Sequence, residues 1–215
     1  IYAAGEQAHV PLMAGWNADE GRGQVVSTTN KTTAEGFAAQ AATDFPGHSD
    51  DFLKLYPHSN DQEALQSASD FAGDRFIAYS TWKWLEAQVA TGQSPVYRYL
   101  FALGSPGDRF HTPAVGAFHS DDIEYVFGTL DSRPEAVWRP EDRKLSNEIQ
   151  TYWSNFARTG DPNGSGLPKW PKYGPTEWQV MHLDKDPVAK PDTHRDRYLF
   201  LDGAWSKPKA ASGSQ

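Results

Sequence analysis

The chain has 215 residues, of which 38% are hydrophobic and 22% charged, and its formal net charge is −8. This length favours one sizeable hydrophobic core, and the negative charge argues against nucleic acid or an anionic membrane surface as a partner. The absence of cysteine excludes a disulfide framework, a thiolate metal site and a cysteine nucleophile. No apolar run is long enough for a membrane span, and because the chain begins at Ile1 we expect a processed or excised segment.

The first predicted strand is the apolar run from Val10 to Gly15, which leads into a polar loop. Short apolar runs are typical of the buried strands of α/β proteins. The loop has the sequence NADEG and ends in Glu20 and Gly21. We therefore expect its acidic side chains at the end of a strand, where reactive groups are often displayed.

Helical patterns follow at Thr33 to Thr43, at Ser49 to Leu55 and from Asp61 to about Gly92, with a break expected near Gly73. In the longest of these stretches, aromatic and aliphatic residues recur at helical spacing. This spacing predicts core positions rather than a ligand site. The residues concerned are Phe71, Phe76, Tyr79, Trp82, Leu85 and Val89.

The second half of the chain is predicted to contain further strands and a long helix. Strand propensity is high from Pro95 to Phe101, and the loop after it leads to His119. An amphipathic helix is expected from about Pro140 to Thr159, with Gly160 as its stop. Its apolar stripe consists of Leu145, Ile149, Tyr152, Trp153 and Phe156.

Three predictions concern the last part of the chain. Trp178 to Leu183 is expected to form a small peripheral strand, and Asp196 to Trp205 a closing helix or strand. The polar, small-residue segment 206–215 is expected to be a flexible tail. Residues 1–205 would then form one structural unit.

Glu20 and His119 have the chemistry of two partners in acyl transfer. In that reaction a histidine takes the proton of an attacking serine, and a carboxylate orients the imidazole and stabilises the imidazolium. α/β-Hydrolases place serine, acid and histidine in that chain order, so an acid followed by a histidine is consistent with it. The residues alone leave open that His119 is an ordinary loop histidine.

Three segments resemble the type B carboxylesterases, the cholinesterase-like family of lipases and esterases: HVPLMAGWNADEG (residues 9–21), GAFHSDDIEYVFG (116–128) and WSNFARTGDPN (153–163). The resemblance implies the C-terminal part of an α/β-hydrolase fold, with late strands of the central sheet and covering helices. It implies Glu20 as the triad acid and His119 as the general base of carboxylic ester hydrolysis. It implies neither a cofactor nor a metal ion, and it favours an extracellular or periplasmic location.

The sequence departs from the family pattern in two respects. It has no G-x-S-x-G nucleophile motif and no H-G-G-type run for an oxyanion hole. The resemblance therefore implies that an N-terminal part of the same enzyme supplies the serine, as a partner of this chain. We expect a small-molecule ester as the substrate, and no activity from this chain alone.

Three alternatives stay open. The chain could be a non-catalytic binding or adhesion module, because esterase-like folds are reused without chemistry. It could also be an inactive fragment. Asp121 and Asp122 could suggest a metal site, but acidic residues at this place also suit the first turn of a helix, which is the reading we prefer.

Overall fold

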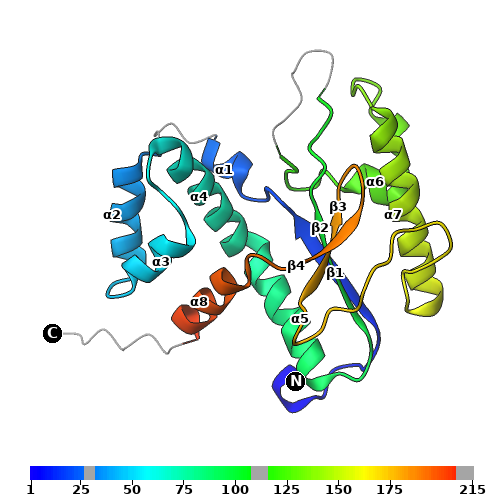
Figure 1. The fold of residues 1–215 in the computed structure, drawn as a ribbon, viewed down its shortest axis with the longest axis horizontal. Coiled ribbons are helices and arrows are strands. Elements are labelled where there is room, and N and C mark those ends of the chain that lie inside the picture. Colours follow the sequence, from blue (N-terminus) through cyan, green and yellow to red (C-terminus); the bar gives the residue numbers. More distant parts are fainter. Residues whose placement is uncertain (27–31, 108–115, 207–215) are drawn as a thin grey trace.

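The computed structural model describes residues 1–26, 32–107 and 116–206 of the chain. The tail predicted at 206–215 lies outside these residues, apart from Ser206. The architecture is α/β, with one four-stranded mixed sheet in the order β1-β2-β3-β4 (Figure 1). Parallel pairing joins β1 (Leu12–Asn17), β2 (Val96–Phe101) and β3 (Gln179–Leu183), whereas β4 (Val188–Pro191) is antiparallel to β3.

Helices account for most of the remaining structure. The shorter helical segments are η1 (Tyr2–Ala4), α1 (Arg22–Val26), η2 (Asp74–Ala78), α6 (Ile123–Phe127) and η3 (Leu130–Ser132). The longer helices are α2 (Ala34–Asp44), α3 (Ser49–Leu55), α4 (Asp61–Gly73), α5 (Tyr79–Thr91), α7 (Pro140–Thr159) and α8 (Arg195–Trp205).

Local sequence explains where several helices begin and end. The Thr33 and Asn60 side chains accept backbone N–H bonds from the first turns of α2 and α4, as expected of N-cap residues. Helix α7 begins with Pro140, whose missing N–H needs no partner there. It ends at Gly160, which has the positive φ of 77° that a glycine tolerates without strain.

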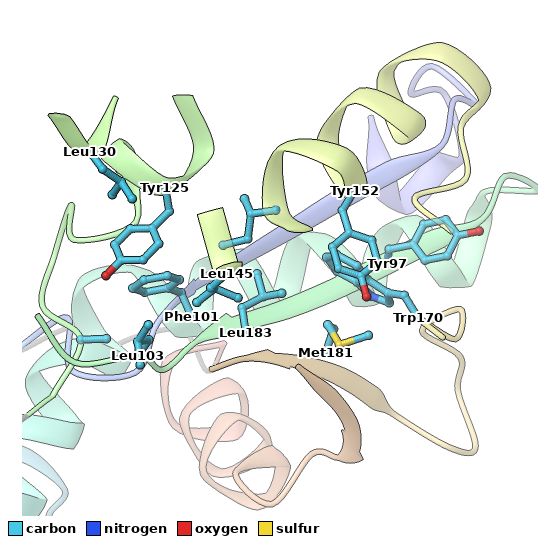
Figure 2. Close-up of a cluster of buried hydrophobic side chains, with 12 residues drawn as sticks. Tyr97, Phe101, Leu103, Tyr125, Leu130, Leu145, Tyr152, Trp170, Met181 and Leu183 are labelled. Carbon is cyan, nitrogen blue, oxygen red and sulfur yellow. The ribbon is translucent and has the colours of Figure 1, made fainter. Parts of the chain in front are cut away.

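The alternation of side chains along β2 explains the layers of the fold. Tyr97 and Phe101 point toward α7, and Val96 packs on the other face with residues of α5 and α8. Figure 1 shows α7 on one side of the sheet and α5 and α8 on the other. Figure 2 shows the α7 side, where buried side chains from β2, β3 and α7 form one cluster.

Most of the predicted elements are confirmed. The strands predicted after Val10 and Pro95 are β1 and β2, and the helices predicted before Gly73 correspond to α2, α3 and α4. Helix α7 has the predicted bounds, and Leu145, Ile149 and Tyr152 of its stripe are fully buried. The segment of undecided type near the end is the helix α8.

The break predicted near Gly73 takes the form of a change in helix type, because α4 ends at Gly73 and the backbone continues as the π-helical turn η2 into α5. The prediction of a peripheral strand near the end of the chain is wrong. The strand β3 is not peripheral, because β2 and β4 pair with its two edges. Strand β4 was not predicted, because its four residues, VAKP, show no alternation of apolar and polar side chains.

Candidate active site

The two predicted site residues lie at the same edge of the sheet. Strands β1 and β2 are parallel, so their carboxyl ends meet at one edge, and the N–H of Ala18 donates to the carbonyl of Phe101 at 2.9 Å. Glu20 follows β1 by three residues, and the chain after β2 leads to His119. In open α/β sheets this edge is where ligands bind.

Glu20 and His119 form a direct hydrogen bond. Nδ1 of His119 is 2.6 Å from Oε2 of Glu20, and the second oxygen, Oε1, accepts the backbone N–H of Asn17 at 2.9 Å. The Glu20 side chain is 5% exposed and the His119 side chain 54%. Among the described residues the imidazole has no other hydrogen-bond partner, so Nε2 is open to the surroundings. A buried carboxylate that holds a half-exposed imidazole in this way is the acid–base arrangement of a catalytic triad.

The residues before these two side chains hold the loops together. The N–H of Asp19 donates to the carbonyl of Ala117, and the N–H of Ala117 donates to Oδ2 of Asp19 at 3.0 Å. Gly116 has φ of 116°, and a Cβ at this position would lie 2.4 Å from the same carboxylate oxygen. Burial raises the pKa of Asp19, against the opposing effect of the bond from Ala117. The sequence therefore needs a glycine at 116 to let the two loops approach.

Asp121 and Asp122 serve the turn around His119. The N–H of Phe118 donates to Oδ2 of Asp121 at 2.8 Å, and Asp122 is the N-cap residue of α6. The preferred interpretation, that these acidic residues suit the start of a helix, is thus confirmed. In the described part of the chain, no group of three or more His, Asp or Glu side chains could hold a metal ion.

The predicted core position of Phe76 is wrong. Phe76 is 47% exposed, and its ring lies edge-on to the imidazole of His119, with 5.0 Å between ring centroids and an angle of 77°. Phe76 belongs to the π-helical turn η2 and lies five residues after Phe71, whereas side chains on one face of an α-helix are three or four residues apart. The apolar ring of Phe76 borders the imidazole of His119, and helical periodicity did not predict this contact.

Gly21 allows the acid loop to pack against the end of α4. A Cβ at Gly21 would lie 2.2 Å from the backbone nitrogen of Gly73, whereas a Cβ at Gly23 would meet nothing within 4 Å. We expect Gly21→Ala to lower the free energy of unfolding by about 1–3 kcal/mol, because backbone must move to admit the methyl group. Urea unfolding measures this change, with Gly23→Ala as the matched control. Equal effects of the two substitutions would contradict the close approach.

A cavity of about 70 Å³ lies beside Glu20, and the side chains that line it include Asp70, Asp74, Arg197 and Tyr198. Asp74 accepts a hydrogen bond from Tyr56 Oη at 2.7 Å and lies 3.9 Å from Nη1 of Arg197. Burial raises the pKa of Asp74 from 3.8 to about 6, against the opposing effects of these two partners. A second buried acid, which the sequence analysis did not single out, therefore lies beside the first.

The raised pKa of Asp74 predicts a pH-dependent stability. Between about pH 4 and 6 the folded chain binds this proton more tightly than the unfolded chain, so the stabilisation is lost as the pH rises through 6. Asp74→Asn keeps an acceptor for Tyr56 but does not titrate. From pH 4 to pH 7, we expect the unfolding free energy of the natural protein to fall by about 2 kcal/mol relative to the variant. A difference that is independent of pH would show that Asp74 ionises normally.

The described residues do not complete a triad. No serine hydroxyl within them forms a hydrogen bond with His119. In the same described residues, no helix is both long and apolar enough to cross a membrane. Within the described residues, the hydrogen-bonded pair of Glu20 and His119 therefore has no serine hydroxyl bonded to its imidazole.

Comparison with known proteins gives consistent results. The sequence model described as "Carboxylesterase family" matches residues 1–200. The chain is similar to carboxylesterase 4A of Bos taurus (38% identity; 58% of this chain and 22% of that protein) and to acetylcholinesterase of Gallus gallus (35% identity; 66% and 18%). Its fold is similar to that of a thermophilic PNB esterase, with a TM-score of 0.71 and 25% identity over 93% of this chain and 40% of that one. The chain thus spans less than half of the length of each of these proteins.

Proposed function

Because this chain belongs to the carboxylesterase family, we propose that Glu20 and His119 are the triad acid and the general base of a serine ester hydrolase. The fold supports this assignment, because it is similar to part of an esterase with the α/β-hydrolase fold, as expected from the sequence. We further propose that residues 1–205 are the C-terminal part of that catalytic domain.

The hydrogen bond between the two side chains is the observation on which this proposal depends. With its Nδ1–H donating to buried Glu20, the imidazole is held in the tautomer that leaves Nε2 as a base. In the proposed reaction a serine Oγ attacks the ester carbonyl carbon, and Nε2 of His119 takes the serine proton. Nε2 then gives this proton to the departing alcohol, and the acyl-enzyme is hydrolysed by a water molecule activated in the same way.

The serine and the oxyanion hole are proposed to lie on an N-terminal part of the same enzyme. The chain has no G-x-S-x-G sequence and spans less than half of its relatives. Within the described residues β1 pairs with β2 alone, although Leu12 and Met13 give it the apolar sequence of an interior parallel strand. An unpaired edge of this kind is what a sheet presents when its neighbouring strand lies on another segment.

A fluorophosphonate probe tests this proposal, because it reacts with an activated serine. We expect the complete enzyme to be labelled on a serine outside this chain, and the isolated chain to remain unlabelled and without ester turnover. Labelling of a serine within residues 1–215 would contradict the division of the triad. If the complete protein does not react with the probe but still binds another molecule, it would instead be a non-catalytic binding module.

A further inference from the structure

Asn17, the last residue of β1, contacts Glu20 and the segment that carries His119. Its backbone N–H donates to Oε1 of Glu20 at 2.9 Å. Its side-chain amide donates to the carbonyl of Phe118 at 2.6 Å and to Oδ1 of Asp122 at 3.2 Å. Asn17 is 2% exposed, so these bonds are shielded from water. One buried residue thus connects the loop of the acid to the loop of the base.

The two side-chain bonds fix the backbone on both sides of His119. Phe118 directly precedes the histidine, and Asp122 begins helix α6 three residues after it. Between them, Ser120 has φ of 73°, in the left-handed region that non-glycine residues seldom adopt. Such a conformation persists only where surrounding contacts hold it. The amide of Asn17 supplies two of these contacts.

The amide group suits this place better than other small side chains. Both acceptors lie on the His119 segment, and asparagine has two N–H donors on one short side chain. Aspartate has the same shape but presents oxygen atoms to the carbonyl of Phe118 and the carboxylate of Asp122. Alanine leaves both acceptors without this partner. The backbone bond from residue 17 to Glu20 survives either substitution, so the side chain acts on the histidine side of the pair.

We propose that Asn17 is a positioning residue for ester hydrolysis, whose side chain holds the His119 turn at the hydrogen-bonding distance from Glu20. This inference rests on the proposed function. Misplacement of a catalytic group by about 1 Å can lower a rate by about 100-fold. We expect the effect on turnover rather than on substrate binding, because Asn17 is 2% exposed and offers almost no surface for a ligand.

The test uses the complete enzyme with Asn17→Ala and the isosteric Asn17→Asp. We expect kcat to fall about 10- to 100-fold in each variant, with KM within about twofold. The downfield proton NMR signal of the His119 Nδ1–H should broaden or disappear. Asn17→Asp preserves the packing volume, so it stands in for Asn17→Ala if that variant does not fold.

Tyr152→Phe is the matched control. It deletes another buried side-chain donor to a backbone carbonyl, the 2.6 Å bond from Tyr152 Oη to Pro168, on the α7 face of the sheet and outside the Glu20 and His119 loops. It should keep both kcat and the NMR signal, even if it lowers the melting temperature as much as Asn17→Ala does.

Two outcomes distinguish a failure of this inference from a failure of the proposed function. If His119→Ala abolishes turnover while both Asn17 variants retain kcat and the NMR signal, Asn17 does not position the base, and only this inference is overturned. If His119→Ala retains turnover, the proposed function itself fails. A loss of kcat in Tyr152→Phe equal to that in Asn17→Ala would show a general loss of stability, which also overturns the positioning role.

Discussion

Replacing His119 by alanine in the complete enzyme is expected to lower kcat by a factor of about 10⁶, because the loss of a triad histidine removes the base that activates the serine. Glu20→Gln should cost about 10⁴, since an amide no longer holds the imidazole in the working tautomer. Steady-state hydrolysis of a chromogenic ester measures both effects. The larger loss should come from His119, which exchanges the proton directly.

His48→Ala is the control for these two substitutions. His48 is an exposed residue before α3, and its side chain makes no capping hydrogen bond. This substitution should leave turnover unchanged. If instead His119→Ala kept more than about a tenth of the natural kcat, the chain would belong to a binding module whose acid and histidine are inherited but unused.

The second large effect is expected from breaking the buried ion pair of Arg98 and Asp192. Both side chains are 3% exposed, and the guanidinium lies over the ring of Trp16, 4.3 Å from its centroid. Arg98→Met leaves the Asp192 carboxylate buried without its counter-charge. We expect the free energy of unfolding to fall by about 3–5 kcal/mol, measured by urea denaturation.

A double-mutant cycle separates the pair from its surroundings. Arg98→Met combined with Asp192→Leu should recover much of the loss, because the stranded charge is then absent. Lys54→Met, which breaks the exposed pair of Lys54 and Asp51, should have little effect. If Arg98→Met alone were as mild as Lys54→Met, Asp192 would have to reach water or bind a proton in the variant.

Trp16 and Asn17 link the ion pair to the site. The indole of Trp16 packs on the guanidinium and on Tyr198 of α8, and the next residue, Asn17, holds the turn of His119. The end of β1 is therefore fixed from the core side by Arg98 and from the loop side by Phe118. A stable core at this point holds the loop of Glu20 in place against the loop of His119.

Local sequence determined most of the elements, because strand and helix formation depend on residues close together in the chain. The apolar run before NADEG predicted β1, and the stripe from Leu145 to Phe156 predicted α7 with its bounds. The resemblance of two segments to a family indicated Glu20 and His119. Neither inference required knowledge of how the segments pack.

Tertiary structure decided the rest, because the deciding contacts join residues far apart in the sequence. The bond between Glu20 and His119 spans 99 positions, and that between Asn17 and Phe118 spans 101. Phe76 was predicted to be a core residue, yet its ring is exposed and lies beside the imidazole of His119. The position of β3 between two strands depended on β4, whose four residues show no strand period. Periodicity reports which side of an element is apolar, whereas only packing determines which other element it meets.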